Sequence, residues 1–326
     1  MTRSPSRSRS IKTLLAIPAM VGFFGAIQLL ARIAPPQLVV RMMAPRMNSP
    51  KHKQKAFAGY QPGPQDVFVC TYSKSGTNWT MQMVVQIAHR GRAVFDNIHH
   101  LVPWPEAPAV PGIAPLSDAT THQSAPTGLR AIKTHLESQY VPYSPQAKYI
   151  VVLRDPKEVL VSSYHFSSKL LPLKRTLPVA EWVELFITGP FQYGSWAEHV
   201  ASFWAWRDRP NVLLLTYGEM KADLPGTVGR VADLMRVRLT EQERAAVVER
   251  CSFEYMRRLD HKFMPPLPAA LNRRRGPTMM RRGAAGGSGE LLTAAQQVLI
   301  DRHMRAELLR RGCDAPYNLL FGEDQT

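Results

Sequence analysis

A short apolar run that passes through a Lys-Ser-Gly turn into a helical pattern restricts the fold of this chain more than any other feature. The run DVFVCTY covers residues 66–72, the turn covers 73–76, and residues 77–89 have the apolar spacing of a helix. A buried strand followed at once by a turn and a helix is typical of α/β proteins with a parallel sheet. The main-chain N–H groups of such a turn can hold an anion, and Lys74 adds a positive charge there.

The rest of the chain repeats this alternation of strand and helix. Apolar strands are expected at 129–135, 147–155 and 211–217, and helices at 156–168, 191–208, 220–235, 241–250 and 292–311. Residues 95–128 and 259–291 show no period. We therefore predict an α/β fold with a parallel β-sheet flanked by helices, which would bind ligands at the carboxyl ends of its strands.

The net charge of +16 is concentrated near the start of the chain. Residues 1–55 contain ten Lys or Arg and no acidic residue, which leaves 31 basic and 25 acidic residues in the remainder. A basic protein can bind nucleic acid, but no helix-turn-helix, zinc-finger or RNA-binding pattern accompanies this charge. The excess in the remainder suits an anionic small ligand, so we expect no nucleic-acid partner. The three cysteines have neither metal spacing nor the even count of a disulfide framework.

An uncharged run of 19 residues at 13–31 lies within this basic extension. It is close to the length of about 20 residues that spans a bilayer, but Pro18 and Gln28 weaken a spanning helix. Basic residues on both sides give no orientation. We interpret residues 1–55 as an extension that contacts a membrane surface; the alternative is a helix packed on the catalytic domain. Prolines make 35–64 a candidate linker, and 56–326 is expected to form one catalytic domain.

A second motif, VVLRDPKEVLVSSYHF, covers residues 151–166. Arg154 follows the predicted strand, and its guanidinium is a rigid set of donors suited to phosphate. Asp155 can cap the next helix, and Pro156 suits the first turn of that helix. Ser162 follows Arg154 by about two helical turns and can add a hydroxyl donor. The alternative for this motif is an ordinary strand-to-helix cap with an arginine on the surface.

With these two motifs the chain resembles the sulfotransferases that use 3'-phosphoadenosine-5'-phosphosulfate (PAPS), most closely the cytosolic aryl and steroid type. The first motif, TYSKSGTNW, is similar to the loop that binds the 5'-phosphosulfate in that family, and the second is similar to the segment that binds the 3'-phosphate. Further similar segments follow in the same order: IKTHL at 132–136, YGSWAEHV at 193–200, YGEMK at 217–221, CSFEYM at 251–256 and MRRGAAG at 280–286. The resemblance spans residues 66–312 and implies the P-loop-like sulfotransferase fold.

The resemblance assigns a role to each matching residue. The 5'-phosphosulfate would be surrounded by Lys74, Ser75, Gly76, Thr77 and Asn78. The 3'-phosphate would be held by Arg154, Ser162, Arg281, Arg282 and Gly283. The adenine would lie between Trp79 and Phe253, with Tyr217 beside it, and Phe166 would belong to the acceptor pocket.

The implied chemistry is in-line transfer of a sulfuryl group to a hydroxyl of a small, lipophilic alcohol or phenol. Lys74 and Lys133 would stabilise charge on the bridging oxygen. His135 would act as the general base, because an unperturbed histidine has a pKa of about 6.5. No metal is expected, since no set of residues has convincing ligand spacing. PAPS is made in the cytosol, so we expect a cytoplasmic enzyme docked on the inner membrane surface.

Three segments depart from the pattern of the family. Ser73 replaces the proline of the first loop, and Gly287, Ser288 and Gly289 stand where the late loop usually has Asp, Trp and Lys. The usual dimer segment keeps only Thr293. The chain is therefore expected to be a monomer, or a dimer formed through another surface.

Three alternative functions remain open at this point. Carbohydrate sulfotransferases share the two phosphate motifs, but usually not the further matches. A P-loop kinase of small molecules would need the Walker spacing, which is absent. A membrane-bound nucleotide-binding module that has lost activity would not be expected to retain Lys74, Lys133 and His135.

Overall fold

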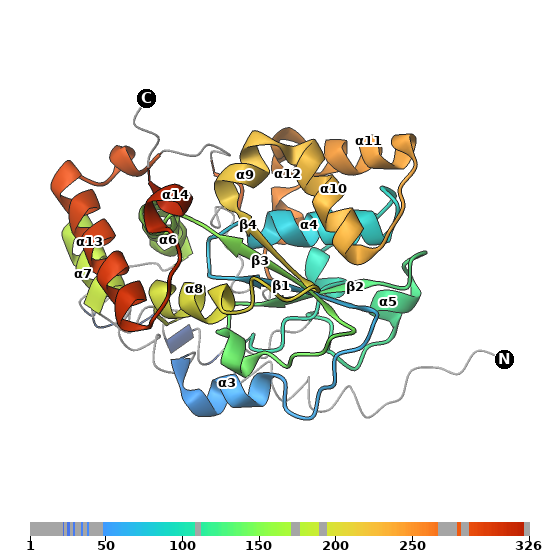
Figure 1. Cartoon of the computed structure of the whole chain (residues 1–326), viewed down its shortest axis with the longest axis horizontal. Helices are drawn as coiled ribbons and strands as arrows, with labels where there is room; N and C mark the ends of the chain where they lie inside the picture. Colours follow the sequence, from blue (N-terminus) through green and yellow to red (C-terminus); the bar gives the residue numbers. More distant parts are fainter. Residues whose placement is uncertain are drawn as a thin grey trace.

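A parallel sheet of four strands forms the centre of the molecule (Figure 1). This computed structural model describes residues 48–107, 112–170, 177–188, 194–266, 279–281 and 287–322, with a few scattered positions between 22 and 38. The strands are β1 (Asp66–Thr71), β2 (Arg130–Thr134), β3 (Lys148–Leu153) and β4 (Val212–Thr216), in the order β2-β1-β3-β4. Every neighbouring pair is parallel. The α/β fold with a parallel sheet is therefore confirmed.

The strand residues alternate between two separate apolar layers. Phe68 and Cys70 of β1 face one layer, whereas Val67 and Val69 face the other. All four are fully buried. This alternation follows from the two-residue period of a strand, and burial on both faces explains why the strands read as continuous apolar runs.

Helices cover both faces of the sheet (Figure 1). One layer is formed with α4 (Thr77–Ala88), α10 (Leu224–Met235), α11 (Glu241–Arg250) and α12 (Phe253–Arg258). The other is formed with α6 (Pro156–Leu170), α7 (Val179–Thr188), α8 (Trp196–Trp204), α13 (Ala294–Arg310) and α14 (Tyr317–Phe321). Short elements complete the chain: α3 (Pro50–Ala56), α5 (Thr120–Gln123), α9 (Tyr217–Ala222), η1 (Ile98–His100), η2 (Ser138–Tyr140), η3 (Asp260–Phe263) and η5 (Ser288–Glu290).

Two helical segments differ from the sequence expectation. The helix expected at 220–235 is divided into α9 and α10, because Asp223 ends the first and its carboxylate caps Gly226 of the second. Pro225 stands in the first turn of α10, where a missing N–H group costs nothing. Between the helices expected at 156–168 and 191–208, where the sequence analysis predicted no element, lies α7, whose Trp182 and Phe186 are buried in the core.

The segment expected as a linker at 35–64 contains the helix α3, and this helix is anchored on the domain. Lys53 forms a buried ion pair with Glu137, with 2.6 Å between Lys53 Nζ and Glu137 Oε1. Phe57, directly after α3, belongs to the core. The proposed division at residue 55 therefore falls inside a docked helix, and it remains a prediction. Most of residues 1–47 lie outside the described residues; no described helix is long and apolar enough to cross a membrane.

Candidate active site

The turn between β1 and α4 is held in an unusual backbone conformation. Lys74 and Gly76 both have positive φ angles, 68° and 95°. Gly76 suits this position for two reasons. Glycine adopts a positive φ angle without strain, and a Cβ atom at this position would lie 3.1 Å from the ring of Tyr217. A left-handed residue in such a turn aims successive N–H groups at one point, which is the geometry of an anion site.

Ser75 gives this turn a polar group that suits an anion. Its hydroxyl oxygen is buried and has no hydrogen-bond partner among the described residues. A buried hydroxyl without a partner is costly unless a ligand satisfies it. Thr77, at the start of α4, is held by a 2.6 Å contact between its hydroxyl and that of Thr71. The residues of the turn therefore fit a phosphate or sulfate group.

Arg154 connects this turn to the next strand end. Its Nη1 donates to the Lys74 carbonyl oxygen over 2.7 Å, and its Nε donates to Glu158 over 2.9 Å. The guanidinium carbon lies 4.0 Å from the centre of the Tyr217 ring. The expected helix start is present as well, since Asp155 accepts from the N–H of Lys157. Arg154 is thus fixed against the turn rather than left as a surface charge.

Three aromatic side chains, Trp79, Tyr217 and Phe253, line the same cavity as Lys74 and Arg154. Trp79 and Tyr217 meet edge to face, with ring centres 5.7 Å apart, and Trp79 Nε1 donates to the Cys251 carbonyl oxygen. Phe253 begins α12 two residues later and lines the same cavity. The apolar faces of these rings suit a flat heteroaromatic base.

Two lysines lie over aromatic rings. Lys74 Nζ is 4.1 Å from the centre of the Phe166 ring, and Lys133 Nζ is 3.5 Å from that of Trp104. Burial, followed by the charge of Arg154, lowers the pKa of Lys74 to about 8. Burial lowers the pKa of Lys133 to about 7. An anionic ligand would stabilise the protonated form of both lysines, because opposite charges attract most strongly where water is excluded.

His135 follows the end of β2 and has a defined tautomer. Its Nδ1 lies 2.8 Å from the Thr71 carbonyl oxygen. A carbonyl oxygen only accepts, so Nδ1 carries the proton and the lone pair of the neutral ring is on Nε2. Burial, followed by the charge of Lys133, holds the pKa of His135 well below its usual range. The ring is therefore neutral near pH 7, with an unprotonated Nε2.

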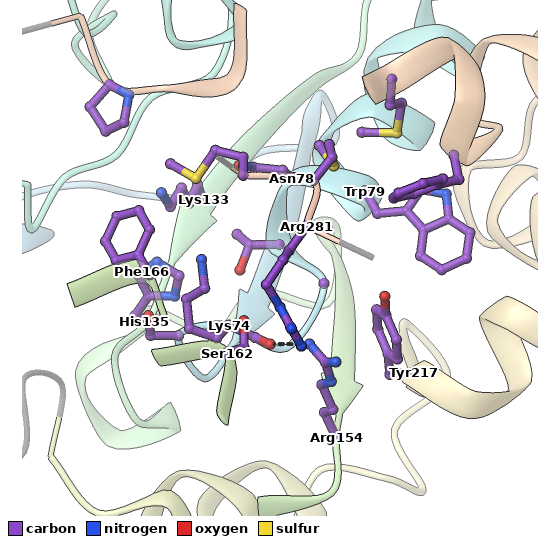
Figure 2. Close-up of a pocket in the computed structure, with 18 of the residues that line it drawn as sticks. Lys74, Asn78, Trp79, Lys133, His135, Arg154, Ser162, Phe166, Tyr217 and Arg281 are labelled. Carbon is purple, nitrogen blue, oxygen red and sulfur yellow. Dashed lines mark hydrogen bonds between the residues drawn. The ribbon is translucent and has the colours of Figure 1, made fainter. Parts of the chain in front are cut away.

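The cavity brings together most of the residues that the sequence suggested. In the view of Figure 2, Lys74, Lys133, His135 and Phe166 lie at one end, Trp79 and Tyr217 at the other, and Arg154 and Arg281 between them. Gly76, Thr77, Asn78, Ser162 and Phe253 also line it. Ser75 lies in the turn but is not among the lining residues. Arg282 and Gly283 lie outside the described residues.

Arg281 is the last described residue of the late loop before the undescribed positions 282–286. It forms an ion pair with Glu290 of η5, and His165 Nε2 lies 3.3 Å from the same carboxylate. Arg281 also lines the cavity with Ser162, on the side where the 3'-phosphate was expected. The three positions that lack the usual Asp-Trp-Lys, 287–289, lie directly before this carboxylate, and two of them fall within η5.

The sequence analysis did not identify several lining residues of the cavity. Trp104 comes from the aperiodic segment 95–128, and its ring meets that of His135 at a distance of 5.6 Å between centres. No periodicity or motif marked it in a segment rich in proline and alanine. The others contribute apolar or sulfur-containing surface: Cys251, Met256, Pro265, Met279 and Met280.

Known proteins match this chain over most of its length. The model of the sulfotransferase domain matches residues 64–312. Sulfotransferase 1C2 of Rattus norvegicus is 31% identical over 249 residues, which cover 73% of this chain and 81% of the relative. Sulfotransferase 2A6 of the same species is 31% identical over 247 residues, covering 73% and 82%.

Solved structures show the same fold. The crystal structure of mouse sulfotransferase SULT7A1 complexed with PAP has a TM-score of 0.59 at 24% identity and covers 80% of this chain and 89% of that one. Retinol dehydratase in a complex with retinol and PAP has a TM-score of 0.63 at 22% identity, with coverage of 82% and 88%. Together with the match of the domain over residues 64–312, these findings show that the chain is an enzyme of the sulfotransferase family.

Proposed function

We propose that this sulfotransferase moves the sulfuryl group of PAPS to the hydroxyl of a small, lipophilic alcohol or phenol. The observation that carries the proposal is the meeting of one neutral histidine and two lysines in a single cavity with aromatic walls. PAPS supplies the sulfuryl group. The two related structures named above contain PAP, the nucleotide that remains after PAPS has lost that group.

The donor would be held by residues at the ends of β1 and β3. The β1–α4 turn, with Lys74 and Gly76 both at positive φ, suits the 5'-phosphosulfate. Arg154, Ser162 and Arg281 surround the place that suits the 3'-phosphate. The adenine would fit between Trp79 and Phe253, with the Tyr217 ring at its edge. Because Arg281 is paired with Glu290 in this structure, a phosphate would compete with that carboxylate.

His135 would remove the proton from the acceptor hydroxyl as the new bond to sulfur forms. The bond from Nδ1 to Thr71 places the basic lone pair on Nε2, and the lowered pKa keeps that lone pair available near pH 7. Lys133, two residues earlier and within β2, would face the developing charge on the bridging oxygen together with Lys74. The proton thus moves to the histidine while the negative charge moves toward the lysines.

The acceptor side of the cavity supports a lipophilic acceptor. Trp104, Phe166 and Met279 give this part of the lining an apolar character, and the lysines already lie over two of its rings. Retinol and androsterone are the small molecules bound in two of the related retinol dehydratase structures. An apolar pocket with few polar groups favours a ring or a hydrocarbon over a sugar, whose hydroxyls would lose their water without partners.

Transfer of radiolabelled sulfate from PAPS across a panel of phenols, sterols, retinoids and sugars tests this proposal. We expect label in at least one phenol, sterol or retinoid and none in the sugars. The His135→Ala variant serves as the control for non-enzymatic transfer. Label that appears only in sugars would replace the proposal by carbohydrate sulfation, and binding of ATP-magnesium in preference to PAPS would contradict the donor.

We propose in addition that residues 1–47 hold the enzyme on the cytoplasmic face of a membrane. The support is the uncharged run at 13–31 and its basic flanks, in which each Lys or Arg can contribute about 1 kcal/mol near anionic lipid. A truncation that begins at Asn48 retains the docked helix α3 and so removes only the segment in question. We expect the full chain, but not this truncated enzyme, to sediment with anionic vesicles. Equal sedimentation of the two would refute the proposal.

A further inference from the structure

The edge of the sheet beside the catalytic residues is completed by a loop. β2 is an edge strand of the described sheet, and Lys133 and His135 stand two residues apart at its end. The N–H groups of alternate residues point to the same side of a strand, so both of these groups need partners outside the sheet. Lys133 N–H donates to the Pro103 carbonyl oxygen over 2.9 Å, and His135 N–H donates to Glu106 Oε1 over 2.6 Å.

Glu106 is therefore the group that fixes the main chain of His135. Its side chain is 2% exposed and does not line the cavity, so it has no direct access to substrate. The segment that carries it is held from the other side as well, since His52 Nε2 of α3 donates to the Glu106 carbonyl oxygen over 3.0 Å. Such a buried carboxylate is costly and is retained only where it has a partner or a task.

The charge of the same carboxylate also acts on the buried lysine Lys133. Lys133 Nζ lies over the ring of Trp104, two residues before Glu106. The charge of Glu106 raises the pKa of Lys133 against the effect of burial, and Lys74 lowers it. Burial raises the pKa of Glu106 itself, whereas the N–H of His135 and the charge of Lys133 lower it. His99 and His135 also lie within the electrostatic reach of Lys133.

We propose that Glu106 is a positioning residue of sulfuryl transfer, which holds the main chain of His135 in place and keeps Lys133 charged. This inference rests on the proposed function, because it assigns to Glu106 the support of the base and of one lysine. The carboxylate has two separable properties. The length of the side chain lets it accept the hydrogen bond from His135 N–H, and its negative charge favours the protonated form of Lys133. Two substitutions separate them.

Glu106→Gln keeps the reach and removes the charge. The pH profile of kcat/KM for the donor reports the ionisations of the free enzyme. We expect the alkaline limb of this profile to move to lower pH by about one unit or more, because the pKa of Lys133 falls when the carboxylate charge is lost. At the acid end of the profile the rate should approach that of the wild type, because Lys133 is then protonated in both enzymes. Glu106→Asp keeps the charge and shortens the reach. Its kcat should fall by about 10–10²-fold, because a small displacement of the base is costly, while its alkaline limb stays near that of the wild type.

Glu137→Gln is the matched control. Glu137, two positions after His135 in the chain, is also buried, but its partner is Lys53 of α3. We expect this control to lower the melting temperature and to leave the position of the alkaline limb unchanged. Thermal unfolding and PAP affinity, measured on all three variants, ensure that only folded enzymes that bind nucleotide are compared.

The outcomes are distinct. His135→Ala and Lys133→Ala variants that remain fully active would overturn the proposed function itself. If those two variants fail while Glu106→Gln has the pH profile of the wild type, the proposal for Glu106 is wrong and the proposed function stands. A Glu137→Gln variant with the same shift of the limb as Glu106→Gln would also overturn it, because the effect would then follow from any lost buried charge.

Discussion

The two walls of the cavity are held in place by different kinds of contact. The wall proposed for the donor, here called the donor wall, comprises Lys74, Gly76 to Trp79, Arg154 and Tyr217, and it comes from the turns and helix starts that follow β1, β3 and β4. The acceptor wall, Trp104, Lys133, His135 and Phe166, combines the edge strand β2 with a loop and with α6. Neighbouring strand ends assemble the donor wall, whereas the acceptor wall also depends on a loop segment and on α6, which do not belong to the sheet.

This difference has a consequence for stability. The acceptor wall relies on two buried polar contacts, His135 N–H to Glu106 and Lys53 to Glu137, and on a half-buried one, His52 to the Glu106 carbonyl oxygen. A buried charge that loses its partner is much more costly than a lost surface contact. The donor wall, in contrast, is fixed by main-chain geometry, such as the positive φ of Gly76, and by the bond of Arg154 to the turn. Substitutions at the supports of the acceptor wall should therefore lower stability, whereas substitutions in the donor wall should mainly lower nucleotide affinity.

The largest effect is expected from the base in the acceptor wall. Because His135 is held neutral, with its basic lone pair on Nε2, His135→Ala should lower kcat by about 10²–10⁴-fold. Affinity for PAP, measured by calorimetry, should change little, since donor contacts lie in the other wall. Undiminished turnover of a good acceptor would contradict the role of His135. A parallel loss of PAP affinity would show that the two walls are not independent.

The second effect concerns the support of the acceptor wall by α3. Lys53→Met leaves Glu137 buried without its cation and should lower the free energy of unfolding by about 3 kcal/mol. The double variant Lys53→Met, Glu137→Leu removes both charges and should recover most of that loss, which denaturant unfolding can measure.

Truncation of the N-terminal segment tests the same ion pair between Lys53 and Glu137. An enzyme that begins at Ala56 lacks Lys53 and should be destabilised similarly, whereas one that begins at Asn48 should not. If both truncated enzymes unfold like the full chain, α3 does not support the acceptor wall.

The smallest of the three effects is expected in the donor wall. Arg154→Ala removes the donor to the Lys74 carbonyl and a candidate phosphate contact, so PAP should bind tenfold or more weakly, at about 1.5–3 kcal/mol for each charged hydrogen bond. The pair Arg281→Ala, Arg282→Ala should behave likewise. Arg154→Lys is the control, because it keeps the charge but not the planar fork, and its affinity should be intermediate. Unchanged PAP affinity in the alanine variants would place the 3'-phosphate elsewhere.

The fold and the donor wall could be predicted from the sequence because their signals are local. Apolar runs of strand length, each followed by a turn and a helical period, fix the alternation of a parallel sheet. Parallel strands end at one edge, so residues that directly follow them, such as Lys74, Arg154 and Tyr217, must meet there. The expected strand ends agree with β1 and β3 to within a few residues.

Only the tertiary structure decided the acceptor wall and its support. Trp104 and Glu106 stand in a proline-rich segment without a period, and α3 stands in a segment that reads as a linker. Their places depend on partners 29 to 84 positions away in the chain: Glu106 on His135, and Lys53 on Glu137. A sequence pattern records which faces are apolar, but a buried charge is stable only beside a particular partner, and that pairing exists only once the chain has folded.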